Sequence, residues 1–476
     1  MKKITVSTEK IIIIVAFVLL SAVYLSLVWN NNVWMDEAFT ASLVHTDFAG
    51  VIRESMNDTL PPLYNIILKL ATDVFGYTTP VMKITSVVPM LLTLLTGAVT
   101  VRKRFGFATS LLFMIFVTFM PLMMYYGVEI RMYSLGFFFA TASGVYAYEV
   151  VSEPGKKNWA LFTCFSVLAG YSHHFAFVTV AFVYLYLLLY FIFFERKGLK
   201  SWFWCLLATF IAYLPCLIVT LSQISRVSGY FSMPEIDLPL FIQYMAYPYT
   251  VGFLPATIVC AGIVGAAVVI FVIKAVLCRS PERDEIYAAC CFTVYYGVLI
   301  FGTIISKIMT ANIFVDRYLF FAAGILWIFP AVILAKSGRS FVPTLIAALL
   351  VGICTYSVEF KIEYSETADE EIAFLRENIK EGDLYYSIGG HEEMQNCIPF
   401  YTYLDKDTPE LTFTTPLEEA LTESSGNGTT LWISVLDGYE PSEDDAKTLE
   451  KYGASLEKKA DFSFDRYKCE FYKVTR

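Results

Sequence analysis

Long runs of apolar residues, separated by short polar stretches, occupy the first three quarters of the chain. A helix needs about 20 apolar residues to cross the hydrocarbon core of a bilayer. We therefore expect about eleven transmembrane helices, and the pattern predicts a polytopic α-helical membrane protein. The expected spans are 11–29, 80–101, 107–126, 133–151, 157–173, 174–194, 200–222, 252–277, 285–306, 314–335 and 339–357.

Basic residues between these runs predict how the chain is oriented. They recur in alternate loops, as at Arg102–Arg104, Lys156-Lys157 and Arg196-Lys197. Because Lys and Arg stay mainly on the cytoplasmic side of a membrane, these loops and the N-terminus are expected in the cytoplasm of a multi-pass cell-membrane protein. The first run is interpreted as a retained anchor, with a cleaved signal peptide as the alternative.

One shorter run, from Pro61-Pro62 to Gly76, is expected to form a helix that does not span. Lys69 and Asp73 interrupt it, and counting it as a span would move Arg102–Arg104 to the outer face. Proline suits the start of a helix, so we expect this helix to lie in the outer interface. The outer loop 30–79 as a whole is expected to carry interfacial helices.

The tail, residues 358–476, has a different pattern. It holds 27 acidic and 12 basic residues, a net charge of −15, whereas residues 1–357 carry +6. Residues 368–379 and 443–452 have helical patterns, and 383–388, 431–436 and 462–474 resemble strands. We predict a transmembrane domain over 1–357 and a small α/β domain over 358–476 on the extracytoplasmic face.

Composition excludes several classes of protein. Of the 476 residues, 57% are hydrophobic, and the mean hydropathy is +0.57, which excludes a disordered chain and argues against a soluble one. No basic surface for nucleic acid is expected. The ten cysteines have no CxxC spacing, so neither a zinc site nor a disulfide framework is predicted. One bridge, between Cys397 and Cys469, is conceivable.

Polar and ionisable residues gather at the expected outer ends of the spans. An ionisable group at membrane depth is costly, so each is a candidate for function. The candidates are Asp36, Glu37, Asp58, Tyr64, Glu129, Arg131, Tyr133, His173, Arg317 and Tyr318. Taken singly, several have structural explanations: Glu129 and Arg131 could form ion pairs with other helices, and Arg317-Tyr318 could anchor a helix end. The functional interpretation depends on their lying together.

Carboxylates with arginines and no nucleotide-binding loop suit transfer from a lipid phosphate. Arginine forks match phosphate oxygens and stay charged, and a carboxylate can accept the proton of an incoming hydroxyl. Fixed arginines can stabilise developing charge without a metal. No cofactor is required by this scheme, although a divalent cation held by Glu37, Glu129 and His173 is a further possibility. Tyr244, Tyr247 and Tyr249 could stack on a sugar.

Taken in order, these residues resemble the membrane glycosyltransferases of GT-C fold, and especially the protein O-mannosyltransferases and lipid A aminoarabinose transferases. The matching pieces, within residues 1–335, are Asp36-Glu37, Pro61-Pro62-Leu63-Tyr64, Glu129-x-Arg131-x-Tyr133, Tyr171-Ser172-His173 and Arg317-Tyr318. The resemblance implies a polyprenyl-phosphate sugar donor and a reaction on the outer face. It implies Asp36 as general base, Glu37 as a neighbouring carboxylate, and Arg131 and Arg317 near the lipid phosphate.

The sequence therefore predicts an inverting hexosyl- or pentosyltransferase whose acceptor is a hydroxyl or amine of a protein, a lipid or a cell-wall polymer. The first alternative is a transporter or flippase, which predicts charged or broken helices at the bilayer midplane and paired half-repeats. The apolar runs show neither feature. The second alternative is a polytopic scaffold whose acidic tail binds a partner.

Overall fold

The computed structural model describes residues 5–227, 235–278, 280–309, 312–364, 368–388, 394–464 and 467–475. The chain divides into two compact units, which are described separately. The first comprises Met1–Leu27, Ile52–Tyr64 and Ile84–Glu359, and the second comprises Val28–Val51, Asn65–Lys83 and Phe360–Arg476.

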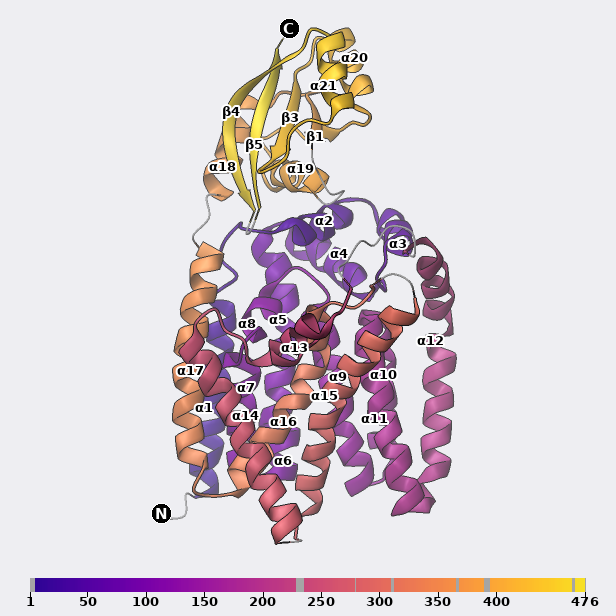
Figure 1. The fold of residues 1–476 in the computed structure, drawn as a ribbon, viewed down its shortest axis with the longest axis vertical. Helices are drawn as coiled ribbons and strands as arrows, with labels where there is room; N and C mark the ends of the chain where they lie inside the picture. The colour runs from indigo at the N-terminus through magenta and orange to yellow at the C-terminus, as the bar shows by residue number, and fades with distance from the viewer. Residues whose placement is uncertain are drawn as a thin grey trace. The chain divides into compact units, whose positions relative to one another are not determined.

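The first unit is helical (Figure 1). Its helices are α1 Val6–Leu25, α3 Phe48–Asn57, α5 Thr79–Thr96, η1 Gly97–Val101, α6 Arg102–Phe105, α7 Phe107–Phe119, α8 Met123–Val128, α9 Tyr133–Ser152, α10 Lys156–Ser172, α11 His174–Phe193, η2 Arg196–Gly198, α12 Leu199–Val227, α13 Leu238–Ala246, η3 Tyr247–Tyr249, α14 Leu254–Val272, η4 Ile273–Leu277, α15 Arg283–Ile308, η5 Asp316–Leu319, α16 Phe320–Lys336 and α17 Phe341–Tyr364. Helices α3, α4 (Leu63–Phe75), α5 and α17 run across the division between the units.

Within the described residues, eight helical stretches are long and apolar enough to cross a membrane. They are Val6–Leu25, Thr79–Phe105, His174–Phe193, Arg196–Leu221, Leu254–Leu277, Arg283–Ile308, Asp316–Lys336 and the stretch that begins at Phe341 with α17. The other three expected spans also contain helices, α7, α9 and α10, which are shorter or less apolar. The polytopic helical fold class is thus confirmed, whereas the number eleven stays a prediction.

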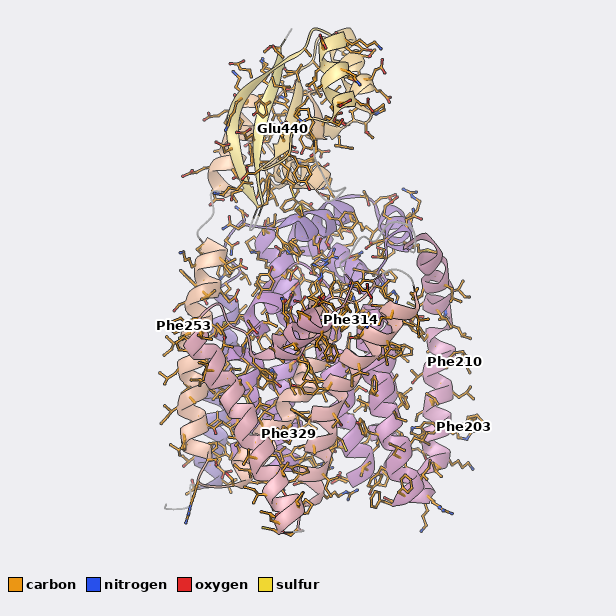
Figure 2. All side chains as sticks on the ribbon, viewed as in Figure 1. Phe203, Phe210, Phe253, Phe314, Phe329 and Glu440 are labelled. Carbon is orange, nitrogen blue, oxygen red and sulfur yellow. The ribbon has the colours of Figure 1, made fainter. Side chains whose placement is uncertain are left out.

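Helix α16 forms the centre of this unit. Every residue from Phe320 to Leu334 is buried, as expected for a helix that is apolar on all sides. It packs against α7, α9, α14 and α15. Helix α12, in contrast, leaves Phe203 and Phe210 about half exposed, and Figure 2 shows both side chains pointing outward. An apolar face of this kind suits contact with lipid.

The helices expected in the outer loop are present. They are α2 Met35–His45, α3, and α4 Leu63–Phe75, which begins directly after the proline pair. At 13 residues, α4 is too short to span a bilayer, which needs about 20. Its location in the interface stays a prediction.

The second unit contains a five-stranded sheet in the order β2-β1-β3-β5-β4. Its elements are α18 Ala368–Asn378, β1 Leu384–Ile388, α19 Met394–Leu404, β2 Thr412–Phe413, α20 Leu417–Asn427, β3 Leu431–Leu436, α21 Glu443–Lys451, β4 Ser455–Phe464 and β5 Tyr467–Thr475. Strand β1 pairs in parallel with β2 and β3, and β5 pairs antiparallel with β3 and β4. All six residues of β3 are buried, as expected for a strand whose residues are all apolar except Ser434.

The α/β fold predicted for the tail is confirmed, with α19, β2, α20 and the first half of β4 as elements that the pattern did not reveal. Cys397 and Cys469 are buried free thiols, so the conceivable bridge is absent between these described residues. The unit also includes 28–51 and 65–83, and α2 packs against α19. Placement of the tail on the outer face stays a prediction.

Candidate functional site

His173 occupies the sharp turn between α10 and α11. Its backbone is extended, and its Nδ1 accepts a hydrogen bond from the backbone N–H of Phe175 at 3.0 Å, which caps the first turn of α11. The side chain is 1% exposed. Because Nδ1 is an acceptor, the neutral ring carries its proton on Nε2. That N–H group is buried and has no hydrogen-bond partner among the described residues.

Two arginines from distant turns lie near this histidine. Burial lowers the pKa of His173 well below its ordinary value, and the positive charges of His174, Arg131 and Arg317 lower it further. A positive charge near the ring disfavours its protonation and so adds to the effect of burial. Arg131 precedes α9 and Arg317 belongs to η5. The structure thus brings two predicted site residues, Arg131 and Arg317, near the neutral imidazole of a third, His173.

Aromatic rings hold the imidazole in place. His173 stacks on Phe321, with ring centroids 4.3 Å apart, and lies 4.7 Å from Tyr318. Phe321 in turn packs against Tyr133 at 5.9 Å. A Cβ at Gly136 would lie 2.7 Å from the Phe321 ring, so only glycine lets α9 approach this ring so closely. Tyr133 and Tyr318 therefore also belong to the group.

Glu129 and Asp316 supply negative charge beside the same cluster. Glu129 is 4% exposed, and burial, followed by the charge of Glu129 and then a weaker effect of Asp316, raises the pKa of Tyr126. The Tyr126 hydroxyl lies 2.6 Å from that of Tyr247. Burial, followed by the charge of Asp316, raises the pKa of Tyr244 to about 12. These tyrosines are thus neutral hydroxyls that can donate hydrogen bonds.

Asp58 and Tyr64 also lie in the first unit, and each forms a hydrogen bond with a neighbouring residue. An Asp58 carboxylate oxygen accepts from the N–H of Thr59 at 2.6 Å, and His174 Nε2 lies 3.2 Å from the Thr59 carbonyl oxygen. The Asp58 turn is therefore next to the histidine pair. Tyr64 is buried, and its hydroxyl lies 2.6 Å from that of Ser86, a bond that fixes α4 to α5.

Asp36 and Glu37 belong to the second unit, in the first turn of α2. They are 5% and 6% exposed. The Glu37 carboxylate accepts a hydrogen bond from the backbone N–H of Trp34 at 3.0 Å, which satisfies a donor at the helix start. Glu37 thus has a capping function. The positive end of the helix dipole favours the ionised form of a carboxylate at the position of Asp36.

The helix that carries Asp36 is tied to the small α/β domain at its other end. The His45 ring stacks parallel to Tyr403 of α19 with centroids 4.3 Å apart, and its Nε2 lies 3.1 Å from Glu410. The Tyr77 hydroxyl donates to the carbonyl of Ala41 at 2.8 Å. These contacts restrain α2 along one face.

A buried ion pair in the second unit was not expected from the sequence. Lys83 is 1% exposed; its ammonium group donates to Glu363 and, at 2.7 Å, to the Asn30 amide oxygen. A lysine within the apolar run 80–101 was the available signal, because a charge there needs a partner.

No cluster of three or more His, Cys, Asp or Glu side chains that could hold a metal occurs within the described ranges.

Comparison with solved structures gives the fold. The crystal structure of ArnT from Cupriavidus metallidurans bound to undecaprenyl phosphate aligns over 97% of both chains, with a TM-score of 0.61 and 12% identity. The chain has the ArnT fold. The apo form of that protein aligns over 97% of both chains, with a TM-score of 0.57. An oligosaccharyltransferase from Archaeoglobus fulgidus, in complex with Zn and sulfate, aligns over 88% of this chain and 67% of its own, with 11% identity and a TM-score of 0.45. The predicted GT-C fold is confirmed. No protein-family model and no curated protein sequence matches the chain.

Proposed function

We propose that this chain is a membrane glycosyltransferase that moves a sugar, with inversion, from a polyprenyl-phosphate donor to an acceptor hydroxyl or amine on the extracytoplasmic face. The observation that supports the proposal is that the turn of Arg317-Tyr318 and the start of α16 pack on buried His173, with the Tyr318 ring 4.7 Å and the Phe321 ring 4.3 Å from its imidazole, and that Arg131 also acts on this ring. The shared fold adds support, because the ArnT crystal structure holds undecaprenyl phosphate.

The arginines suit the charge that develops on the leaving group. When the bond between the anomeric carbon and the phosphate oxygen breaks, a phosphate diester becomes a monoester and gains negative charge. Guanidinium groups hold such oxygens through paired hydrogen bonds and stay charged. Arg131 and Arg317 therefore stabilise the leaving phosphate in this proposal, and the neutral hydroxyls of Tyr244 and Tyr126 line the sugar side.

The acceptor oxygen forms the new bond to the anomeric carbon on the face opposite the leaving phosphate, and its proton passes to Asp36. A buried carboxylate can act as this general base. Glu37 supports the reaction by holding the first turn of α2. No divalent cation is needed for the scheme, because the two arginines offset the phosphate charge.

The first experiment identifies the substrates. Lipid-linked sugars and surface glycans are compared by mass spectrometry in cells with and without the gene. If the protein is a glycosyltransferase, cells without the gene should accumulate the lipid-linked donor and lack the corresponding glycan. An unchanged glycan profile, together with substrate flux in liposomes that contain the purified protein, would instead support the transporter alternative and reject this proposal.

The second experiment tests the base. With the donor identified, Asp36→Asn should fold and insert but lose at least about a hundredfold in transfer rate, the usual contribution of general-base catalysis. The matched control is Glu37→Gln, whose amide oxygen can still accept from Trp34 and should leave the rate within about tenfold. Full activity of Asp36→Asn would remove Asp36 from the mechanism.

A further inference from the structure

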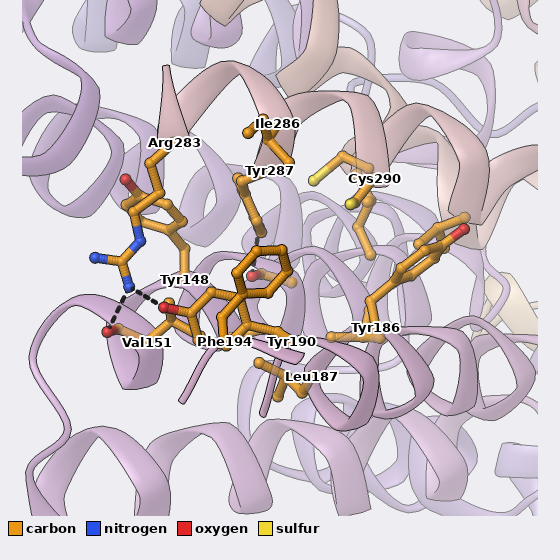
Figure 3. A pocket seen from close by; sticks show the side chains of 16 residues that line it. Tyr148, Val151, Tyr186, Leu187, Tyr190, Phe194, Arg283, Ile286, Tyr287 and Cys290 are labelled. Carbon is orange, nitrogen blue, oxygen red and sulfur yellow. Dashed lines mark hydrogen bonds between the residues drawn. The ribbon is translucent and has the colours of Figure 1, made fainter. Parts of the chain in front are cut away.

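The helical unit contains a cavity far from the His173 turn. It has a volume of about 390 Å³ and lies between α9, α11 and α15 (Figure 3). Its walls come from the halves of α9 and α11 that are farthest from Tyr133 and His174, and from the first turns of α15. The cavity is thus at the end of the unit that carries the basic loops, away from the proposed sugar site.

The polar groups in the walls are already bonded to protein. The Tyr287 hydroxyl donates to the Gly144 carbonyl at 2.6 Å, and the Tyr148 hydroxyl bonds to Asp284. A Cβ at Gly144 would lie 3.0 Å from the side chain of Ile325, so the backbone of α9 packs closely against α16 beside the cavity. The remaining surface is mainly apolar and aromatic, and its volume falls within the usual range of ligand pockets, about 300–1,000 Å³. It suits a hydrocarbon chain.

One cation, Arg283, lines the cavity. Its Nη2 donates to the Val151 carbonyl at 2.8 Å and to the Tyr190 hydroxyl at 2.9 Å, as Figure 3 shows. The guanidinium carbon lies 5.5 Å from the centre of the Tyr190 ring. Both hydrogen bonds use Nη2, so Nε and Nη1 have no acceptor among the described residues and can bind an anion. A guanidinium held in this way is pre-organised for phosphate oxygens.

The carboxylates next to Arg283 are matched by lysines. Lys336 lies 2.7 Å from Glu282 and 2.6 Å from Asp284, and Lys274 lies 2.7 Å from Glu285. These pairs remove most of the negative potential that would repel an anion. The cavity therefore combines an apolar interior with one positive charge that is free to attract a phosphate.

We propose that this cavity binds an anionic glycerophospholipid of the adjoining leaflet, with one acyl chain inside and the phosphate on Arg283. Basic pockets between transmembrane helices on the cytoplasmic side bind anionic head groups by the same chemistry. The lipid would fill the gap between α9, α11 and α15 and hold these helices together. The site is separate from the sugar donor and does not depend on the proposed reaction.

Photolabelling tests the head-group contact. The full chain is placed in phosphatidylcholine nanodiscs that contain photoactivatable phosphatidylglycerol, and labelled peptides are mapped. Arg283→Gln should reduce labelling of α9, α11 and α15 about fivefold, the effect of about 1 kcal/mol per basic residue, and Arg283→Lys should restore part of it. Arg196→Gln, an exposed charge at the same end of α11, should leave labelling unchanged. Equal labelling by phosphatidylcholine, or no effect of Arg283→Gln, would overturn the proposal.

A matched pair of bulky substitutions tests the acyl chain. Ile286 lines the cavity and is 49% exposed, whereas Ile300 of the same helix is 51% exposed and lies outside it. Ile286→Trp should reduce labelling about fivefold or more, because the larger side chain fills part of the cavity and the acyl chain then buries less apolar surface. Ile300→Trp should leave labelling unchanged. Equal effects of the two would overturn the site. Displacement of the label by undecaprenyl phosphate but not by unlabelled phosphatidylglycerol would overturn the choice of lipid.

Discussion

The two ends of α9 and α16 use charge in different ways. At the ends near Ser152 and Lys336, cations meet carboxylates: Arg104 forms two hydrogen bonds with Glu149, and Lys336 pairs with Asp284. At the beginnings of the same helices, Arg131 and Arg317 adjoin a neutral histidine. Matched pairs indicate groups that serve stability, whereas two arginines gathered at a turn with a buried, neutral histidine indicate a place suited to an anion.

The largest expected effect is on the histidine end. Exchanging Arg131 and Arg317 together for Gln should lower sugar transfer by about a hundredfold or more, because two charge-assisted contacts to phosphate contribute about 1.5–3 kcal/mol each. Binding of undecaprenyl phosphate, measured on the purified protein in nanodiscs, should weaken in parallel. Unchanged binding would show that this end does not differ from the other in the way proposed.

Breaking an ion pair at the opposite end should act on stability instead. Arg104→Gln leaves the Glu149 carboxylate, which is 3% exposed, without its guanidinium partner. A loss of about 3–5 kcal/mol is expected, measured by thermal unfolding in detergent. The double variant with Glu149→Gln should recover part of this loss. The rate of sugar transfer per folded molecule should stay near that of the wild type. A large decrease in this rate would contradict the proposed difference between the two ends.

The neutral histidine predicts a pH dependence. Because the pKa of His173 is lowered in the folded state, folding favours the neutral ring. The stability from this preference is complete above the unfolded value of about 6.5 and is lost as the pH falls below it, by up to about 1.4 kcal/mol per pH unit. Melting temperatures between about pH 7.5 and pH 5 should fall more steeply for the wild type than for His173→Gln. Parallel curves would show that His173 is not buried in its neutral form.

The smallest effect is expected at the exposed margin of the paired end. Lys336→Gln removes contacts to Asp284 and to Glu282, whose side chain is 60% exposed. Pairs in such positions contribute about 0–1 kcal/mol. The melting temperature should therefore change much less than in Arg104→Gln. A comparable loss would mean that all pairs at this end act as one network.

The parts of the fold visible in the sequence are those set by local pattern. The long apolar runs revealed α11 and α16, alternation revealed β1, and a short apolar run revealed β3. The grouping of Glu129, Arg131, His173 and Arg317 also followed from the sequence, because each lies in a turn at the same expected end of the bundle. The roles of Asp36 and Glu37 stay predictions, apart from the cap that Glu37 forms.

What the sequence did not reveal depends on partners far along the chain. Lys83 and Glu363 are 280 positions apart, and neither residue's neighbours indicate the other. The acceptor role of His173 Nδ1 depends on the backbone of one turn. The cavity beside Arg283 requires three helices at a particular spacing, which no pattern along one helix specifies.

The packing of α2 against α19 has a consequence for exchanging parts between proteins of this fold. The compact unit that holds the sheet also contains 28–51 and 65–83, and His45 stacks on Tyr403 within it. A chimera that replaces only the last 119 residues would leave those two segments facing an unfamiliar surface. Transplants should move all three segments as one module, and sequence libraries should vary them together.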